Sequence, residues 1–280
     1  MFRKSALVCA AIVLAVWGAF VVAPEPAYEP HRPDADYRAA AADYLVRNLT
    51  PMPEGWRWDH HTAADGKKMR WGSAAPEGLV RGTVIFVPGF AGALEMYADY
   101  HHALLARGYR VYGFDLRGQG GSDRMLANPE KPWISDFGIY ADDLAGFVDH
   151  VRQQVDGPLV LMGESFGGHV SLRAVGDHAL DVDGLMLVAP AMKILTPYGY
   201  QTSRLMVEAG RKLGFGERYA PMQANWQPFV TDLTVGNYCG NVAERVHIKD
   251  ALHTERPEIR VGGTTNQWVA EIMESGARIS

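Results

Sequence analysis

Cysteine is scarce in this sequence, which contains only Cys9 and Cys239 among its 280 residues. Cys9 lies in an apolar stretch near the N-terminus, so we expect no disulfide between the two. Long runs of basic residues are absent as well, and the formal net charge is -5. The composition therefore gives no indication that the protein binds nucleic acid. No metal-binding, nucleotide-binding or flavin-binding pattern occurs either, and we predict a protein that works without a cofactor or a metal.

Apolar residues, by contrast, make up 48% of the chain, which is enough for a sizeable core. A length of 280 residues suits one α/β domain with an insertion, or two small domains. Between residues 83 and 190, apolar runs of strand length alternate with segments of helical periodicity. Continuous apolar runs such as residues 83–87 are typical of parallel strands that are buried on both faces. The alternation predicts an α/β fold built on a doubly wound, mostly parallel sheet.

The first 33 residues differ in composition from the rest of the chain. Residues 5–23 carry no charge, follow Arg3 and Lys4, and approach the ~20 residues that a helix needs to cross a bilayer. We expect residues 1–23 to be an uncleaved signal anchor, with a cleaved signal peptide as the alternative. The basic residues in front predict a cytoplasmic N-terminus, with the remainder in the periplasm or outside the cell. Residues 24–33 include four prolines and are predicted to be a stiff linker.

Residues 34–190 are predicted to form the core of the fold, and residues 191–280 a helical cap. The core begins with an expected amphipathic helix at residues 34–49. A hairpin follows, whose Asp65-Gly66 pair is typical of a type I′ turn. From Ala191 onward the chain is rich in Tyr, Met, Trp and Pro and has no clear buried strand. We expect this last segment to lie over the carboxyl end of the sheet.

The candidate active site is the stretch 159–169, which reads Leu-Val-Leu-Met-Gly-Glu-Ser-Phe-Gly-Gly-His. An apolar strand runs into a Gly-x-Ser-x-Gly pattern, and a helix-compatible segment follows. This is the strand, sharp turn and helix in which a serine becomes a nucleophile. Gly163 and Gly167 let the strand and the helix approach closely. We therefore predict that Ser165 is the catalytic nucleophile, with an ordinary serine in a glycine-rich turn as the alternative.

Attack by a serine needs a base that removes its proton and donors that stabilise the oxyanion. In this arrangement the donors are the backbone amide just after the nucleophile and a second amide from the turn after the third strand. These are the amides of Phe166 and, after Pro88-Gly89, of Phe90. Phe166 also opens a helix, whose N-terminal dipole favours negative charge. Phe90 and Phe166 are therefore predicted to form the oxyanion hole.

Four segments carry a resemblance to a known family. They are Pro88-Gly89-Phe90, the Arg-Gly-Gln-Gly-x-Ser pattern within residues 115–122, the elbow at residues 163–168, and residues 260–264 with Trp268. Together they resemble the bacterial lysophospholipase and monoacylglycerol lipase branch of the α/β-hydrolases, from about residue 56 to the C-terminus. The resemblance implies an α/β-hydrolase fold and a cap that forms the channel for the acyl chain. It also implies that the loop of Arg117 shapes the wall beside the oxyanion hole.

The family orders its catalytic triad as serine, acid and histidine, with the last two on loops after strands that follow the cap. No segment before Ser280 supplies those strands, so we expect a C-terminally truncated chain whose acid and histidine follow Ser280. His247 and His253 fall inside the predicted cap. His169 should point along its helix, away from Ser165, as a packed residue.

Two further acidic positions are interpreted as structural. Asp142-Asp143 fits the solvated first turn of a helix, and Glu164 should point to the opposite side of the elbow from Ser165. A C-terminal truncation would leave the strand at residues 185–188 as an exposed apolar edge, which natural folds avoid.

We predict a serine hydrolase that cleaves carboxylic esters of a single acyl chain, lysophospholipid or monoacylglycerol, through an acyl-serine intermediate. The expected anchor favours a lipid substrate, because it holds the cap near the bilayer in which such amphiphiles reside. The alternatives are an esterase for small soluble esters and a non-catalytic binding protein that keeps the fold without the base. The sequence specifies neither the head group and acyl-chain length nor the oligomeric state.

Overall fold

The computed structural model of the protein describes residue 25 and residues 27–196, 198–229, 233, 245 and 247–279. The predicted anchor at residues 1–23 and both cysteines lie outside these described residues. Within them, no helix has both the length and the apolar character that crossing a membrane requires. The signal anchor and its location therefore stay predictions.

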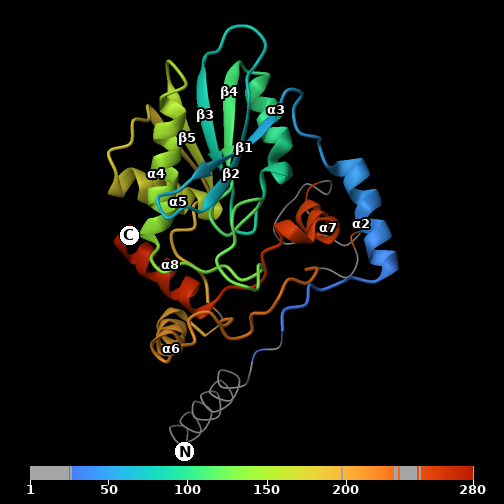
Figure 1. The fold of residues 1–280 in the computed structure, drawn as a ribbon, viewed down its shortest axis with the longest axis vertical. Helices are drawn as coiled ribbons and strands as arrows, with labels where there is room; N and C mark the ends of the chain where they lie inside the picture. The colour runs from blue at the N-terminus through green and yellow to red at the C-terminus, as the bar shows by residue number, and fades with distance from the viewer. Residues whose placement is uncertain are drawn as a thin grey trace, which may run out of the picture.

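A mixed sheet lies at the centre of the described chain (Figure 1). Its strands are β1 (Arg57–Thr62), β2 (Lys68–Ala74), β3 (Gly82–Val87), β4 (Tyr109–Phe114), β5 (Leu159–Glu164) and β6 (Gly184–Val188). They lie in the order β1-β2-β4-β3-β5-β6, so β6 is an edge strand. β3 pairs in parallel with β4 and β5, and β5 with β6, whereas β2 is antiparallel to β1 and β4. The prediction of a mostly parallel sheet in an α/β fold is confirmed.

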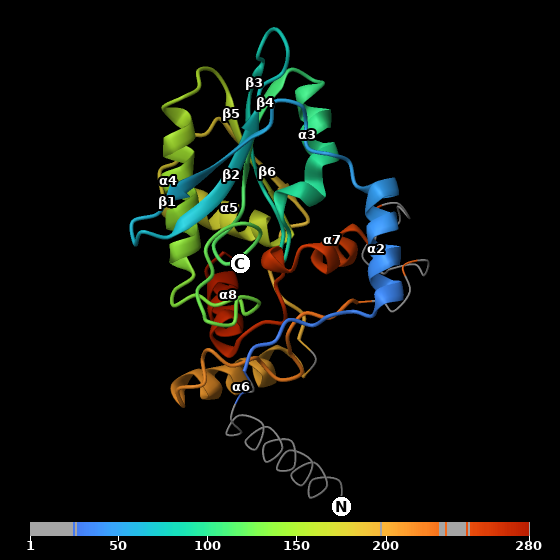
Figure 2. The ribbon, with the colours of Figure 1, turned by 45° about the vertical axis from the view of Figure 1, so that its right-hand side comes forward.

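Helices cover both faces of this sheet (Figure 2). They are η1 (Leu94–Tyr97) and α3 (Ala98–Leu105) on one face, and α4 (Gly138–Arg152) and α5 (Ser165–Asp177) on the other. Successive side chains of a strand point to opposite faces, which explains the division. In β3, Ile85 belongs to the core cluster that contains Phe147 of α4, whereas its neighbour Phe86 belongs to the cluster that contains Leu94 of η1. Every residue of β3 is buried, as expected for a strand covered on both faces.

The described helices after β6 are α6 (Tyr200–Lys212), α7 (Ile248–Glu255), η2 (Pro257–Ile259) and α8 (Asn266–Arg278). Of these, α6 and α8 lie below the sheet in Figure 1, and α7 lies beside α2 (Ala35–Asn48). α8 packs against α6 and contributes Trp268 to the main core cluster. The predicted N-terminal helix is confirmed as α2, which begins where the Asp34 carboxylate accepts a hydrogen bond from Tyr37 N at 2.8 Å. This helix packs against α7, so the two ends of the described chain share one apolar cluster.

The hairpin of β1 and β2 is confirmed, but its turn differs from the predicted type I′ turn. Ala63 N donates to Lys67 O at 2.8 Å and Gly66 N donates to Ala63 O at 2.9 Å, which leaves residues 64–66 as a three-residue loop. Only Gly66 has a positive φ there, 82°. A type I turn followed by a left-handed glycine is the usual form of such a loop. The longer loop allows the Asp65 carboxylate to reach Arg117 at 2.6 Å.

One buried histidine of the α3 face makes stability depend on pH. His101 is fully buried and stacks on Trp56 with ring centroids 4.7 Å apart, and burial lowers its pKa from 6.5 to about 4. The unfolded chain therefore binds a proton below about pH 6.5 that the native chain takes up only near pH 4. Acidification from pH 7 to pH 5 should cost about 2 kcal/mol at this position. Urea unfolding of His101→Phe, which keeps the stacking, should show a pH dependence weaker by that amount. An unchanged pH dependence would contradict this assignment.

Candidate active site

Ser165 sits at the junction where β5 ends and α5 begins. Its backbone is left-handed, with φ 50°, which is uncommon for a residue that has a Cβ atom. The preceding Glu164 is still extended, so the chain turns sharply at Ser165 itself. Strain of this kind is found mainly at functional sites, where the surrounding structure imposes it. The structure therefore has the strand, turn and helix geometry on which the prediction for Ser165 depends.

Glycines on both sides of Ser165 make this turn possible. A Cβ on Gly163 would lie 2.6 Å from the carbonyl oxygen of Gly167, and a Cβ on Gly167 would overlap the carbonyl oxygens of Val87 and Pro88. No side chain fits at either position without moving backbone. The start of α5 thus rests directly on the ends of β5 and β3.

The two predicted oxyanion donors lie at neighbouring strand ends. β3 and β5 are adjacent in the sheet, and the strand order reverses between them, so a crevice for ligands is expected outside their carboxyl ends. A Cβ on Gly89 would lie only 3.2 Å from the Cβ of Ser165, so the turn after β3 runs directly beside the serine. Phe166 is the second residue of α5, and its amide belongs to the first turn, where N–H groups lack an intrahelical acceptor. The ring centroids of Phe90 and Phe166 are 6.2 Å apart.

A cavity of about 390 Å³ opens over Ser165. Its wall combines the turn after β3, the start of α5, the segment after β6, and helices α6 and α8. Among the described residues that line it, none is an aspartate, a glutamate or a histidine. The apolar members are Phe90, Phe166, Ala191, Ile194, Leu195, Met206, Val207, Ala220, Pro221, Trp268, Val269 and Ile272. Phe90, Phe166 and Trp268 belong to the motifs visible in the sequence, but the lining residues of α6 do not. For these, the strongly amphipathic pattern of residues 200–212 was the available signal.

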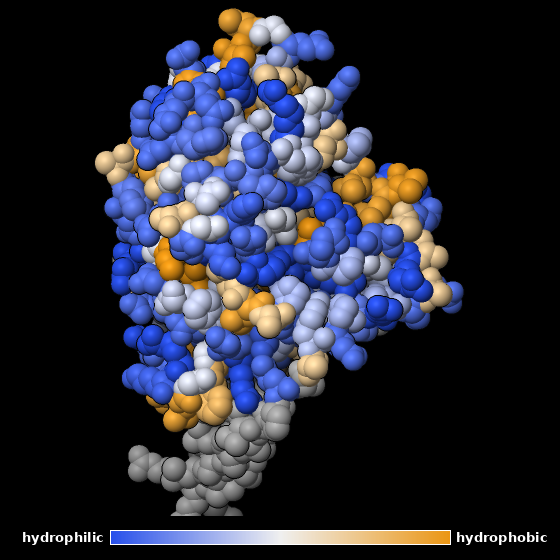
Figure 3. Space-filling view, viewed as in Figure 1, coloured by the Kyte–Doolittle hydropathy of each residue, from blue (hydrophilic) through white to orange (hydrophobic). Residues whose placement is uncertain are grey.

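The rim of this cavity exposes apolar side chains. Leu195 is fully exposed although it belongs to the lining, and Tyr198 beside it is 39% exposed. Met222, next to the lining residue Pro221, is 75% exposed and has a φ of 66°. Figure 3 shows further apolar surface at the lower left over α6, the helix that carries the exposed Leu205. At Leu195, Tyr198 and Met222, the mouth of the cavity therefore presents apolar groups to its surroundings, whereas Leu205 lies outside the lining.

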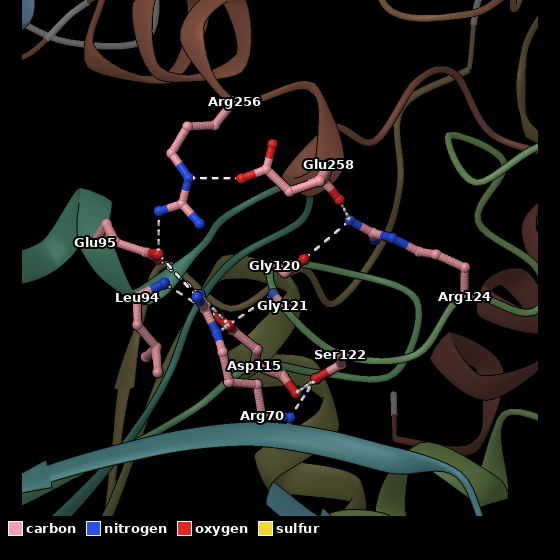
Figure 4. A network of polar contacts seen from close by, with 10 residues as sticks. All are labelled: Arg70, Leu94, Glu95, Asp115, Gly120, Gly121, Ser122, Arg124, Arg256 and Glu258. Carbon is pink, nitrogen blue, oxygen red and sulfur yellow. Dashed lines mark hydrogen bonds and ion pairs between the residues drawn. The ribbon is translucent and has the colours of Figure 1, made fainter. Parts of the chain in front are cut away.

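A buried ionic network supports the loop that follows β4 (Figure 4). Asp115 is buried and binds Arg70 from β2, whose guanidinium also holds Glu95 at 2.7 Å. Burial opposes the ionisation of Glu95, but the hydrogen bonds and charge of Arg70 outweigh it, so the pKa of this carboxyl lies below its usual range. Arg256, at the end of α7, binds Glu95 at 2.6 Å and Glu258 at 2.8 Å. The network ties the loop to the sheet, to η1 and to the C-terminal segment.

Arg117 in the same loop is buried and does not belong to the cavity lining. It binds Asp143 of α4 through two parallel hydrogen bonds of 2.7 Å and reaches Asp65 in the hairpin. The prediction of a solvated Asp142-Asp143 pair is therefore wrong for Asp143, which is 4% exposed, although Asp142 does face the solvent. Asp143 lies on the face of α4 that is turned toward Arg117, whereas Asp142 lies on the outer face of the same helix. Glu164 accepts a hydrogen bond from the Tyr97 hydroxyl at 3.0 Å, in keeping with its structural interpretation.

None of the candidate histidines lies at the described cavity wall. His169 is fully buried, with Nδ1 2.8 Å from Ala191 O and Nε2 2.8 Å from Ser275 Oγ, so the prediction of a packed histidine is confirmed. His253 is buried against Trp226, and His247 packs against Tyr44. The acid and histidine expected after Ser280 are not tested by the described residues and stay predictions.

The chain is similar to hydrolases in sequence. A family model described as serine aminopeptidase, S33 matches residues 78–280. The chain is 29% identical over 202 residues to lysophospholipase L2 of Escherichia coli (strain K12), a match that covers 70% of this chain and 57% of that protein. It is 22% identical over 221 residues to monoglyceride lipase of Mus musculus, covering 79% of this chain and 66% of that protein. The chain thus spans little more than half the length of the lysophospholipase.

Solved structures show the same fold. A soluble variant of monoglyceride lipase from Saccharomyces cerevisiae, in complex with a substrate analog, matches with a TM-score of 0.57 and 20% identity, over 82% of this chain and 70% of that chain. A thermostable carboxyl esterase from Bacillus coagulans matches with a TM-score of 0.60 and 15% identity, over 81% and 74%. At these identities the likeness shows the fold and no more.

Proposed function

Because this chain belongs to the serine aminopeptidase S33 family of α/β hydrolases, we propose that it cleaves carboxylic esters of single-acyl lipids with Ser165 as the nucleophile. The observation that carries the proposal is the position of Ser165. This residue is held in a left-handed conformation at the wall of a cavity whose other lining is mostly apolar. The lysophospholipase and monoglyceride lipase relatives support an ester of one acyl chain as the substrate class.

In the proposed reaction, Ser165 Oγ attacks the ester carbonyl and a general base accepts its proton. The carbonyl oxygen becomes an oxyanion, which the amides of Phe90 and Phe166 stabilise. Collapse of the tetrahedral intermediate expels the alcohol, which takes up the proton, and leaves an acyl group on Ser165. Water then attacks the acyl-serine by the same route and releases the carboxylic acid. The family resemblance predicts a histidine as the base.

The character of the cavity supports an ester with a long acyl chain over a peptide. Recognition of a peptide by its terminal ammonium group calls for a carboxylate near the nucleophile, because a buried charge needs a partner. The described lining offers apolar side chains with a few hydroxyl and amide groups, which suit a hydrocarbon chain. The exposed Leu195 and Tyr198 at the rim extend the apolar surface outward. If residues 1–23 anchor the protein as predicted, this rim lies near the lipids from which such a substrate comes.

Acyl-chain selectivity tests the proposal through Met206, which lines the cavity from α6. Met206→Trp fills part of the cavity and should lower kcat/KM for lysophosphatidylcholine and long-chain monoacylglycerol by about 10-fold to 100-fold, since overpacking costs ~1–3 kcal/mol. Hydrolysis of p-nitrophenyl acetate should change by less than about 3-fold, because its acyl group ends near Ser165. The matched control is Leu205→Trp, which places the same side chain on the exposed side of the same helix.

Two outcomes would replace the proposal by its alternatives. A wild-type protein that prefers short soluble esters over long-chain lipids, with equal effects of both tryptophan variants, indicates an esterase for small substrates. A full-length protein that hydrolyses none of these esters, and whose Ser165 resists a fluorophosphonate, indicates a non-catalytic binding protein.

A further inference from the structure

Gln119 makes a hydrogen bond to another loop, which goes beyond the expected role of its own loop as a wall beside the oxyanion hole. Its side chain is buried, and Oε1 accepts a hydrogen bond from the backbone amide of Ala91 at 2.5 Å. Ala91 directly follows Phe90, whose amide is the proposed second oxyanion donor. A loop after β4 thus holds the turn after β3 at the residue next to the reacting groups.

Ala91 needs such a partner because its conformation is unfavourable. Its φ is 56°, in the left-handed region that residues with a Cβ atom rarely adopt. The turn itself contributes one hydrogen bond, from Gly92 N to Gly89 O at 3.0 Å. Without the Gln119 side chain, the buried Ala91 amide would lose its acceptor, and relaxation of its φ would rotate the adjoining peptide. Among the described residues, no hydrogen bond engages the amide of Phe90 itself, so the direction of that donor depends on the conformation of the turn that Gln119 holds at Ala91.

Gln119 is itself held firmly. Ser122 Oγ donates to Asp115 O at 2.7 Å, and Gly121 N donates to the Asp115 carboxylate at 3.0 Å, so the loop closes on its own first residue. A Cβ on Gly120 would overlap the Asp115 carboxyl group, which shows how tightly the chain turns next to Gln119. Figure 4 shows the loop joined through Asp115 to Arg70 on β2. The side chain that reaches Ala91 therefore starts from a rigid base.

We propose that Gln119 is a positioning residue for ester cleavage: by holding the Ala91 amide, it aims the Phe90 amide at the oxyanion that forms beside Ser165. The role rests on the proposed function, since it assumes that Ser165 is the nucleophile and Phe90 a donor. Donors of an oxyanion hole act through their fixed direction toward the charge of the transition state. A small rotation of the turn after β3 reduces that stabilisation while the cavity for the acyl chain stays as it is.

The test compares two substitutions of nearly equal size. Gln119→Met removes the acceptor, and Gln119→Glu keeps an oxygen that accepts from Ala91 N. For p-nitrophenyl octanoate, Gln119→Met should lower kcat about 10-fold to 100-fold with KM changed less than about 3-fold, since loss of a whole oxyanion donor costs about 10²-fold to 10³-fold. Gln119→Glu should recover at least about half of that loss on a logarithmic scale. The affinity for a long-chain alkyl trifluoromethyl ketone, whose adduct with serine carries an oxyanion, should fall in parallel with kcat.

Asn128 provides a control for the loss of a side-chain amide contact elsewhere in the fold. It is half-buried, its Oδ1 accepts a hydrogen bond from the backbone amide of Glu130 at 3.0 Å, and its Nδ2 donates to Asn225 Oδ1 at 2.8 Å. Asn128→Ala and Gln119→Met should both lower the urea concentration at the midpoint of unfolding, since each removes a side-chain hydrogen bond to the backbone. Only Gln119→Met should lower kcat and the affinity for the trifluoromethyl ketone.

The outcomes separate this role from the proposed function. If Gln119→Met is folded and turns over at the wild-type rate while Ser165→Ala is inactive, the positioning role is wrong and the nucleophile stands. If Gln119→Met and Gln119→Glu lose kcat equally, or if Asn128→Ala loses as much, the effect is one of general stability and the positioning role is again wrong. If the wild type neither hydrolyses the ester nor binds the ketone, both proposals fail together.

Discussion

Replacement of Ser165 by alanine is expected to lower kcat/KM for ester hydrolysis by about 10⁴-fold or more, which corresponds to at least about 5 kcal/mol of transition-state stabilisation. The size of the effect follows from the chemistry, because no acyl-enzyme forms without the hydroxyl. What should remain is the stabilisation that the proposed oxyanion donors, the amides of Phe90 and Phe166, give to direct attack by water. Alanine keeps the same left-handed backbone, so the free energy of unfolding should change by less than about 0.5 kcal/mol.

Labelling with a fluorophosphonate followed by peptide mapping shows which serine reacts. The label should be found on Ser165 and should be absent from Ser165→Ala. Ser203→Ala is the matched control, because Ser203 is a second serine at the wall of the same cavity but lies within α6, in a regular helix. It should be labelled as the wild type is. A folded Ser165→Ala protein that keeps ester turnover and the label would exclude Ser165 as the nucleophile.

The elbow was predictable because each of its requirements is local. An apolar run, two glycines and a helix-compatible segment appear within residues 159–169, and the structure brings them together with the expected backbone. The parallel strands were predictable for the same reason, since continuous apolar runs such as residues 83–87 are buried on both faces. The assignment of Phe90 and Phe166 as donors implied that the turns after β3 and β5 are adjacent, and the observed strand order β4-β3-β5 provides that adjacency.

Contacts between distant segments were not predictable from local pattern. Asp143 was expected in solvent, yet it lies opposite Arg117, 26 residues away in the chain. α2 was predicted as an amphipathic helix and is one, but the partner of its apolar side, α7, lies about 200 residues later in the chain. Gln119 falls within the Arg-Gly-Gln-Gly-x-Ser pattern, but that pattern does not indicate its partner, because the strained amide that it holds belongs to another loop. In each case the partner is chosen by the tertiary fold, and a single sequence does not encode that choice in its periodicity.

Loss of the Asp143 carboxylate is expected to have the largest effect on stability among the substitutions considered. Asp143 and Arg117 are 4% and 2% exposed, and they form two parallel hydrogen bonds of 2.7 Å. Asp143→Ala leaves the buried guanidinium with Asp65, which is 51% exposed, as its remaining carboxylate partner. Removal of one member of a buried pair costs about 3–5 kcal/mol, because the other charge is left uncompensated. Urea unfolding at pH 7 should show a loss of this size.

The adjacent Asp142 is a control within the same helix. Its side chain is 66% exposed and pairs with His178 at 2.9 Å on the surface. Asp142→Ala should change the free energy of unfolding by less than about 1 kcal/mol, as is usual for exposed pairs. Equal losses of stability in the two alanine variants would show that the buried pair of Asp143 with Arg117 contributes no more stability than the exposed pair of Asp142 with His178.

A double substitution separates the pair from the rest of its surroundings. Arg117→Met combined with Asp143→Leu replaces both charges by apolar side chains of similar size. Buried ion pairs contribute little net stability relative to apolar replacements, since the attraction between the charges is offset by the cost of removing both from water. The double variant should therefore be more stable than Asp143→Ala by about 2 kcal/mol or more, and the two positions should be strongly coupled in a double-mutant cycle. If the double variant loses as much stability as Arg117→Met and Asp143→Leu lose when added together, the two positions are not coupled, and breaking the pair is not the cause of the loss. If the double variant regains stability but has a lowered kcat, Arg117 is needed to place the loop that carries Gln119. The charge pair then contributes to the geometry of the active site and not to stability.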